Sequence, residues 1–255
     1  MKLPALLVVA LATKACAFVL WLAGAKPALA AACFIAPDPF LLWGLFVPSA
    51  QGLVRVFTHF ATNRREVWLT IDDGPDPEDT PRILDLLDRH GARATFFVIG
   101  ERAARHPELI REIVRRGHEV AHHTHTHPHA TFWCAGPARL AAELDRALAA
   151  LGEAGVKPRW FRPPVGIKHL LLGRALAQRD LRCVGWTVRS GDSRAGSAAA
   201  VVRQVAPRLR SGAIVLLHEG PRLTASVRVQ GIALVLEMCA QRGFACVIPR
   251  ADQLR

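Results

Sequence analysis

The sequence predicts an α/β protein: a distorted (β/α)7-type barrel with a parallel sheet, preceded by an N-terminal apolar helical hairpin. From residue 65 onward, short apolar and β-branched runs alternate with helical patterns, which indicates parallel strands covered by helices. Two long apolar stretches precede that region. The length of 255 residues suits one main domain with a short appendage. We therefore expect a membrane-associated helical region at 1–63 and the main domain at 64–255.

Residues 3–24 and 28–49 are apolar stretches, each close to the ~20 residues that cross a bilayer as a helix. Lys14 interrupts the first and Pro37-Asp38-Pro39 the second, so the alternative is a helix at the membrane surface or against the main domain. A signal peptide is the competing interpretation, because the start is basic and Ala28-Leu29-Ala30 resembles a cleavage site. We favour a membrane hairpin, because the chain stays apolar beyond that site.

Basic residues around the hairpin predict its orientation. Lys26 lies between the two stretches, and Arg55, Arg64 and Arg65 follow them, which places the main domain on the cytoplasmic side by the positive-inside rule. A single span or a cleaved signal would instead export the domain. The cysteines show no paired CxxC spacing and favour a reducing compartment; they are Cys16, Cys33, Cys134, Cys183, Cys239 and Cys246.

The net charge of +12 suits an anionic partner, which could be nucleic acid, an acidic lipid surface or a phosphorylated substrate. The basic residues are scattered and form no long run interleaved with aromatic residues, so we expect no nucleic acid partner. The apolar N-terminus predicts a membrane partner. Nothing in the sequence indicates an obligate protein partner.

The main domain divides into strand and helix patterns in alternation. We predict strands at 66–71, 94–99, 119–121, 158–162, 182–188, 213–217 and 244–248. We predict helices at 80–90, 107–116, 136–153, 168–179, 197–210 and 227–242. Glycines such as Gly91 and Gly117 end several of them, as expected for residues that follow a helix.

Polar residues gather directly after the predicted strands. Asp72-Asp73 follow the first strand, a histidine-rich tract the third, Arg162 ends the fourth, Asp192 follows the fifth, and His218 follows the sixth. In parallel α/β barrels the loops at the carboxyl ends of the strands build the active site. Titratable groups from five loops are therefore expected to meet at one end of the barrel, which we call its mouth.

The adjacent carboxylates of Asp72 and Asp73 repel each other in a confined site unless a cation or base compensates. Adjacency at a strand end lets them point in different directions, so one can bind a metal while the other accepts a proton. A plain acidic turn punctuated by Gly74-Pro75 is the alternative.

Six of the eleven histidines fall between residues 118 and 129. His123 and His127 have the i, i+4 spacing that places two imidazoles on one face of a helical turn. The pairs His118/His122 and His125/His129 share that spacing, and a solvated histidine-rich loop remains the alternative. One aspartate with two histidines would leave open coordination sites, as a catalytic metal requires.

Four ordered motifs resemble those of the polysaccharide deacetylase family, also called the NodB-homology family or carbohydrate esterase family 4. LTIDDGPDP resembles its TFDDGP motif, and HTHTH (residues 123–127) its H-[ST]-x-x-H motif. RPPVG (162–166) resembles R-x-P-x-G, and IVLLHEG (214–220) its late strand-then-histidine motif. The resemblance covers about residues 66–250.

This resemblance implies a role for each matching residue. Asp73, His123 and His127 would bind a divalent metal ion, for which zinc is the first choice and cobalt, nickel or manganese are alternatives. Asp72 would be the general base and His218 the general acid, with Arg162 holding Asp72 ionised. The substrate cleft would include Pro164, Val165 and Leu216, with the backbone N–H of Val165 as an oxyanion donor. Trp186 is a further candidate for the lining of the acyl pocket, and the alternative is a core residue, as a tryptophan in a strand more often is.

Two positions depart from the family pattern. Val165 stands where an aromatic residue is common, and Arg189-Ser190-Gly191-Asp192-Ser193 stands where D-x-x-D-W is common. An inward-pointing Arg189 would disfavour a protonated His218. We predict that Asp192 pairs with His218 instead.

The resemblance implies a metal-dependent hydrolase that removes an N-acetyl or N-formyl group from an amino sugar of a glycan or of a lipid-linked saccharide. One alternative is an O-acetyl esterase that acts on a polysaccharide. Another is a catalytically weak, membrane-anchored relative that binds glycans. The altered motif around Arg189 favours the last alternative, and the intact motifs oppose it.

Overall fold

The computed structural model describes residues 4–224 and 227–255. A curled sheet of parallel strands forms the main domain, and its strand order is β1-β6-β5-β4-β3-β2-β8-β7, with β9 also paired to β2. The strands are β1 (Val56–Phe57), β2 (Glu66–Asp72), β3 (Ala94–Val98), β4 (Glu119–His122), β5 (Trp160–Phe161), β6 (Arg182–Val184), β7 (Val188–Arg189), β8 (Ile214–His218) and β9 (Ala245–Cys246). The predicted fold class is confirmed.

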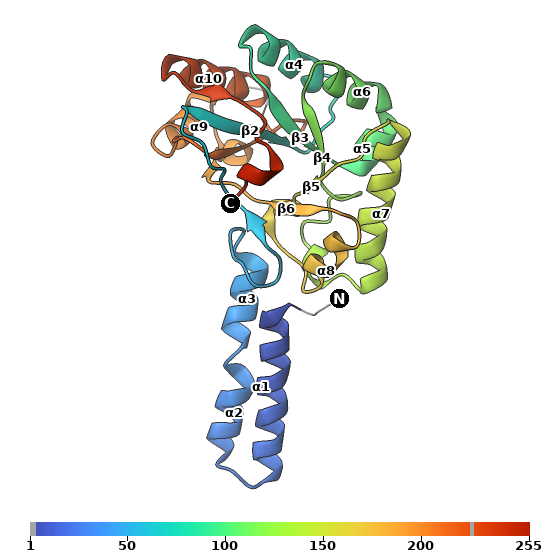
Figure 1. Cartoon of the computed structure of the whole chain (residues 1–255), viewed down its shortest axis with the longest axis vertical. Coiled ribbons are helices and arrows are strands. Elements are labelled where there is room, and N and C mark those ends of the chain that lie inside the picture. Colours follow the sequence, from blue (N-terminus) through green and yellow to red (C-terminus); the bar gives the residue numbers. More distant parts are fainter. Residues whose placement is uncertain (1–3, 225–226) are drawn as a thin grey trace.

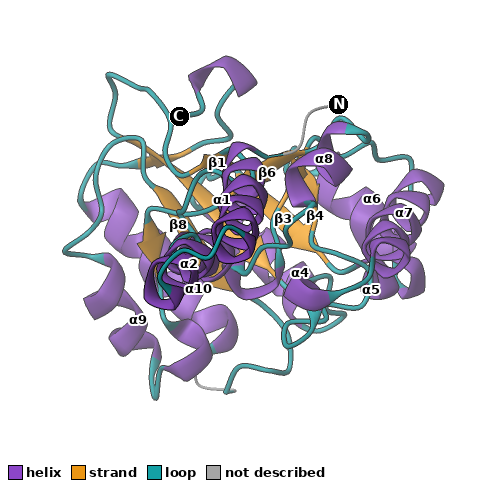
Figure 2. Cartoon of the chain, turned by 90° about the horizontal axis from the view of Figure 1, so that it is seen from below, coloured by secondary structure: helices purple, strands orange, loops and turns teal. Residues whose placement is uncertain are grey.

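Helices surround the strands, as parallel connections require. They are α4 (Asp79–Arg89), α5 (Gly100–Arg105), α6 (Pro107–Arg115), α7 (Pro137–Glu153), α8 (Leu172–Ala177), α9 (Ala198–Val205) and α10 (Arg228–Gln241). Short 3-10 turns add η1 (Phe132–Cys134), η2 (Pro164–Gly166), η3 (Asp192–Arg194) and η4 (Ala251–Gln253). Figure 2 shows the strands in the middle, with α5, α6 and α7 on one flank and α9 on the other.

The prediction of one strand at 182–188 is wrong, and the barrel is distorted in this segment. Two short strands replace it, because β6 pairs with β1 and β5 while β7 pairs with β8 at the other end of the sheet. The intervening residues cross between the two ends: Gly185 donates its N–H to Phe57, and Thr187 donates its N–H to Ile214. This crossing carries Trp186 to the rim of the barrel mouth.

Two further elements escaped prediction. Helix α5 is short, and its sequence offers too few apolar residues to show a helical period. Strand β1 has only two residues and lies before the predicted boundary at 63/64, which itself stays a prediction. The predicted helix at 168–179 begins only at Leu172, because the side chains of Lys168 and His169 bond backbone carbonyls of other loops.

Strand β2 shows how the sheet positions the site. Its alternate residues Val67, Leu69 and Ile71 face the helices and join the outer core. The side chains between them face the barrel interior, where Trp68 packs edge-on against Trp160 and donates a hydrogen bond to Thr95. Because side chains alternate along a strand, the same periodicity aims Asp72 inward at the carboxyl end of β2.

The N-terminal hairpin consists of α1 (Ala5–Leu22) packed against α2 (Pro27–Ile35) and α3 (Asp38–Phe46). Figure 1 shows it as a column that projects away from the barrel. Segments Ala5–Leu22 and Pro27–Phe46 are long and apolar enough to cross a membrane. The break between α2 and α3 falls at the proline-rich interruption, and Asp38 there lies 2.8 Å from Lys14 of α1.

The base of the hairpin contacts the barrel mouth. Lys168 donates hydrogen bonds through its side chain to the carbonyls of Val47 (2.6 Å) and Pro48 (3.2 Å). Burial lowers the pKa of Lys168 to about 8. Gly166 lies so close that a Cβ atom there would approach both Pro48 and Trp186 to 2.7 Å. The hairpin therefore joins the domain beside the loop that follows β5.

Candidate active site

The residues predicted for the site meet in one cleft at the carboxyl ends of the strands. Strand β2 delivers Asp72 and Asp73, the loop after β4 delivers His123 and His127, and β8 ends at His218. The cleft measures about 370 Å³, and these five residues line it together with Val165, Trp186 and Leu216. Pro164, which was also predicted for the cleft, is buried and is not among the lining residues.

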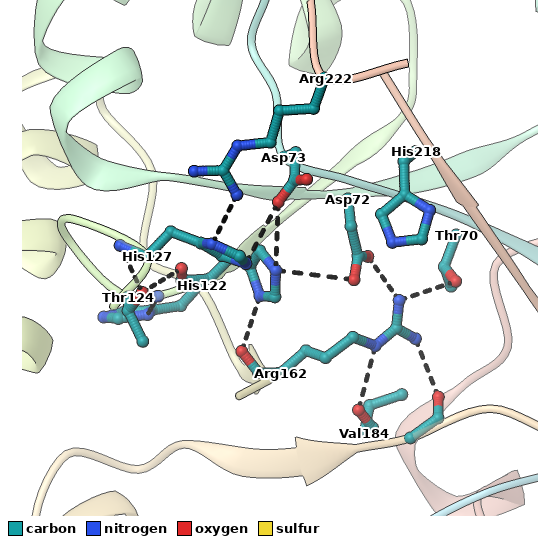
Figure 3. Close-up of polar contacts among 12 residues, drawn as sticks. Thr70, Asp72, Asp73, His122, Thr124, His127, Arg162, Val184, His218 and Arg222 are labelled. Atoms are coloured by element: carbon teal, nitrogen blue, oxygen red, sulfur yellow. Dashed lines mark hydrogen bonds and ion pairs between the residues drawn. The ribbon is translucent and has the colours of Figure 1, made fainter. Parts of the chain in front are cut away.

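Arg162 fixes the position of Asp72 inside the barrel. Its guanidinium Nη1 lies 2.5 Å from Asp72 Oδ1 and 3.0 Å from the hydroxyl of Thr70. The remaining N–H groups donate to the carbonyls of Val184 and Gly185, at 3.2 and 2.8 Å. Figure 3 shows this fan of contacts. Burial lowers the pKa of Arg162 and Asp72 counteracts that shift, and one hydroxyl and two carbonyl oxygens accept hydrogen bonds from the buried guanidinium.

Asp73, His123 and His127 offer ligand atoms that lie within 4.8 Å of one another. Asp73 Oδ1 is 3.5 Å from His123 Nε2 and 3.4 Å from His127 Nε2. His123 Nδ1 is 2.7 Å from the carbonyl oxygen of Arg162, which assigns the proton to Nδ1 and leaves Nε2 as a ligand. Asp73 Oδ1 is buried without a hydrogen-bond partner among the described residues.

A divalent cation fits this arrangement. One carboxylate oxygen from the end of β2 and two imidazole nitrogens from the loop after β4 converge across β3, and the orphaned oxygen of Asp73 is the atom that a cation would satisfy. Burial raises the pKa of Asp73, but the larger combined effect of His123, His127 and His218 holds it below its ordinary range. Burial lowers the pKa of His127 to about 3, so His127 is neutral and able to bind a metal.

The expected helical turn around these histidines is wrong. Residues 123–127 form an irregular loop, in which Thr124 (φ 64°) and His127 (φ 55°) take left-handed backbone conformations. The hydroxyl of Thr124 accepts the N–H of His127 at 3.1 Å. The two imidazoles therefore converge through a tight loop.

Glu143 of α7, which was not predicted as a site residue, holds the loop in place. Its carboxylate accepts the N–H groups of His125 (3.0 Å) and Thr126 (2.9 Å) and the hydroxyl of Thr126 (2.6 Å). His122 points away from the cleft and lies 2.9 Å from the carbonyl of Leu144. Burial lowers the pKa of His122 to about 4. Of the three histidine pairs with equal spacing, the structure brings only His123 and His127 to Asp73 among the described residues.

His218 is paired with Asp192 of η3. The carboxylate of Asp192 lies 2.7 Å from His218 Nδ1 and accepts the backbone N–H of His218 at 2.7 Å. Burial alone would lower the pKa of His218, but Asp192, with smaller contributions from Asp72 and Asp73, raises it to about 9. The imidazole is thus held protonated, and none of the described residues accepts a hydrogen bond from its Nε2, which faces the cleft as a donor.

Three more residues support the site without having been predicted. Arg222 Nη1 lies 3.0 Å from His127 Nδ1, and Arg102 donates to the backbone carbonyl of Asp73 at 2.7 Å. Glu219 is buried next to His218 and accepts the hydroxyl of Thr80 at 2.6 Å. Burial raises the pKa of Glu219 to about 8. Arg102 and Arg222 lie outside the motifs and carry no periodic signal, and the motif that contains Glu219 does not indicate its contact with Thr80.

Comparisons with known proteins identify a family model and relatives that match this chain in sequence. The family model for polysaccharide deacetylase matches residues 60–184. A chitooligosaccharide deacetylase of Sinorhizobium fredii is 41% identical over 75% of this chain and 93% of its own length. One from a Bradyrhizobium species is 43% identical over 61% of this chain and 71% of its own length.

The chain belongs to the polysaccharide deacetylase family. A solved structure of a family 4 carbohydrate esterase from Streptomyces lividans, in complex with acetate, superposes with a TM-score of 0.67 and 34% identity. That match covers 76% of this chain and 97% of the esterase. The resemblance predicted from the four motifs is therefore confirmed, as is the prediction of a hydrolase of this class.

The two residues that depart from the pattern of the polysaccharide deacetylase family, Val165 and Arg189, both line the cleft. Arg189 is exposed at the rim of the cleft, whereas Asp192 contacts His218 Nδ1 at 2.7 Å. The contact that raises the pKa of His218 is thus made by Asp192. Val165 is 47% exposed at the opening, with left-handed backbone at φ 50°. The rim is thus more open and more basic than the motif consensus implies.

Proposed function

We propose that this chain is a membrane-anchored, divalent-metal-dependent deacetylase of N-acetylated amino sugars. The observation that carries the proposal is the juxtaposition of the Asp73, His123 and His127 cluster with two proton-transfer groups, Asp72 and His218, in one cleft. The chitooligosaccharide deacetylases to which the chain is similar support an N-acetyl substrate.

A divalent metal held by Asp73, His123 and His127 would supply Lewis acidity, which acidifies a water molecule and polarises the amide carbonyl. We favour zinc because oxygen and imidazole ligands suit it, with cobalt, nickel and manganese as the alternatives. His123 keeps its ligand nitrogen aimed at Asp73 through its contact with the Arg162 carbonyl.

Asp72 accepts a proton from the attacking water, whose oxygen forms a bond to the amide carbon. Arg162 keeps Asp72 ionised and oriented for this step. His218 then donates its Nε2 proton to the amide nitrogen as the carbon–nitrogen bond breaks, while Asp192 stabilises the imidazolium until that transfer. The carboxylic acid gives its proton to the released amine, so the products are a carboxylate and an amino sugar in the ammonium form. Return of the proton on Asp72 to His218 through solvent restores both groups.

The N-terminal hairpin supports attachment to a membrane. Its two apolar segments have the length of bilayer spans, and large apolar side chains such as Phe18, Trp21, Leu22 and Phe40 are more than half exposed. Orientation with the domain on the cytoplasmic side stays a prediction from the basic residues after the hairpin. A reporter fused to the C-terminus tests it, because the reporter is active on only one side of the membrane.

The deciding experiment uses the full chain in detergent, stripped with a chelator and then reloaded with zinc. We expect acetate release from N,N′-diacetylchitobiose that disappears on chelation and returns with metal. Faster release from an O-acetylated sugar would favour the esterase alternative. Metal binding without release from any acetylated or formylated sugar would favour the weak, glycan-binding relative.

A further inference from the structure

A second hollow adjoins the catalytic cleft. It measures about 510 Å³ and shares Trp186, Arg189 and Ser193 with the cleft as lining residues. The two hollows therefore lie side by side at Trp186, Arg189 and Ser193. We refer to the second hollow below as the arginine groove.

The arginine groove is basic. Arg189, Arg194 and Arg208 line it, all three are exposed, and its lining contains no carboxylate. Across residues 4–224 and 227–255, no carboxylate lies within ion-pair distance of any of the three guanidinium groups. By contrast, the half-buried Arg116 contacts Asp85, Asp88 and Glu112. The groove thus presents uncompensated positive charge beside the site.

The segment that follows the hairpin also lines the arginine groove. Pro48 and Ser49 lie two and three residues after the end of α3 and contribute to the lining. Lys168 fixes that segment through the carbonyls of Val47 and Pro48. The groove therefore lies where the proposed membrane segment meets the catalytic mouth.

Exposed aromatic and apolar side chains mark the same border. Trp43 (50% exposed) and Phe46 (40%) end the hairpin, and Trp133 (38%) and Val165 (47%) face outward from the domain. The rings of Phe46 and Trp133 lie 5.5 Å apart. Tryptophan is enriched where a protein crosses the membrane–water interface, so the mouth opens close to the level of lipid headgroups.

We infer that the arginine groove binds the phosphate that links an amino sugar to a membrane lipid. This inference rests on the proposed function, because it names the substrate class of the same site. In a 2-acetamido sugar the anomeric carbon is bonded to the carbon that carries the amide, so a phosphate on it lies next to the reacting group. Guanidinium groups bind phosphate oxygens through paired, charge-assisted hydrogen bonds, and the lipid chain would follow the hairpin into the bilayer.

The test compares three acetylated probes with the full chain in phosphatidylcholine vesicles. They are a farnesyl-phosphate-linked N-acetylglucosamine, soluble N-acetylglucosamine 1-phosphate, and uncharged N,N′-diacetylchitobiose. The groove variant is Arg194→Gln/Arg208→Gln, which spares Arg189 because that residue also lines the cleft. Arg82→Gln/Arg89→Gln on α4 removes the same charge from an exposed helix away from the mouth and is the matched control.

We expect the groove variant to lose about tenfold or more of its kcat/KM for the two phosphate-bearing sugars relative to diacetylchitobiose, because each charge-assisted hydrogen bond is worth at least about a factor of ten. The matched control should keep wild-type rates. In wild type, the farnesyl-linked sugar should have the lowest KM. An equal change for all three probes, or no preference of the wild type for phosphate, overturns the inference. Equal KM for the soluble and farnesyl-linked phosphates overturns the lipid source.

A binding measurement separates this inference from the proposed function. A fluorescent farnesyl phosphate without sugar should bind wild type and the α4 control, and should bind the groove variant about tenfold or more weakly. Equal binding to all three proteins contradicts the arginine groove, whatever the enzyme activity. Absence of acetate release from every probe, with this binding difference intact, contradicts the deacetylase and leaves the phosphate site standing.

Discussion

The barrel mouth and the N-terminal hairpin each hold an ion pair among apolar side chains, but they satisfy it differently. Arg162 is completely buried with Asp72, and its other N–H groups reach a hydroxyl and two backbone carbonyls. Lys14 contacts Asp38 and one carbonyl, and both side chains remain partly exposed. In the barrel, protein groups surround the charged pair and accept its hydrogen bonds. In the hairpin, the two charged side chains stay partly exposed to whatever surrounds the protein.

This contrast explains what each region can do alone. A buried pair with all its partners holds Asp72 in one orientation, which is what a proton acceptor requires. The hairpin leaves apolar side chains outward and contributes little to the core of the barrel. Changes in the mouth should therefore be large and specific, and changes in the hairpin pair should be small.

The largest expected effect comes from His123→Ala. Loss of one ligand should release the metal and reduce acetate release by about a thousandfold or more, because Lewis-acid assistance is worth several kcal/mol and each ~1.4 kcal/mol is a factor of ten. Metal content measured by elemental analysis should fall in parallel. His90→Ala, an exposed imidazole at the end of α4, is the control and should keep both. Full metal content in His123→Ala would remove that residue from the ligand set.

Arg162→Met should be the next largest change. It strands the Asp72 carboxylate in the barrel, which costs about 3–5 kcal/mol of the free energy of unfolding for a broken buried pair. Urea denaturation measures this cost. Arg162→Met/Asp72→Leu removes both charges and should recover most of the lost stability while remaining inactive. If Arg162→Met alone were as stable as wild type, the ion pair would be less enclosed than its contacts indicate.

Asp192→Asn should move the pH dependence of activity. The carboxylate raises the pKa of His218, so its loss lowers that pKa, and the alkaline limb of the rate profile should shift to lower pH. The raised pKa stabilises the fold below about pH 6.5, the pKa of an unfolded histidine, and this contribution disappears as pH rises through about 9. Thermal unfolding should therefore separate the variant from wild type at pH 6 more than at pH 10. If the alkaline limb did not shift, Asp192 would not be the group that keeps His218 protonated as the general acid.

The smallest expected effect concerns the hairpin pair. Lys14→Leu/Asp38→Leu removes both charges and should change acetate release by less than about twofold and stability by less than about 1 kcal/mol, since partly exposed pairs contribute little. Asp38→Leu alone should weaken retention in vesicles more than the double variant, because it leaves Lys14 unpaired in the apolar segment. Flotation of vesicles measures retention. Equal retention of the single and double variants would show that the hairpin does not sit in a bilayer.

Hydrophobic periodicity and motif spacing in the sequence correctly predicted the main strands and the position of the polar residues at their ends. Strands such as β2 and β8 are continuous apolar runs, and their polar ends fall at the mouth because parallel strands share one direction. The pairing of Asp192 with His218 was also expected, and the structure places the two groups in contact.

The sequence could not predict features that depend on tertiary contacts or on single backbone angles. The histidine loop takes left-handed conformations at Thr124 and His127 and depends on Glu143 of a distant helix, so a spacing rule for helices misjudged it. The break at Gly185–Thr187 arises because the sheet curls and its two ends need different partners. Arg222 and Glu219 reach the site through folding of the last third of the chain.

The central claim is that the neighbouring aspartates have separate tasks, and one measurement tests it directly. Asp72→Asn and Asp73→Asn are compared for bound metal and for acetate release from diacetylchitobiose. We expect Asp72→Asn to keep its metal while losing about 10²–10⁴ in rate, the usual contribution of a general base, and Asp73→Asn to lose both. Metal loss in Asp72→Asn, or full activity in either variant, would contradict the division of labour between the two carboxylates.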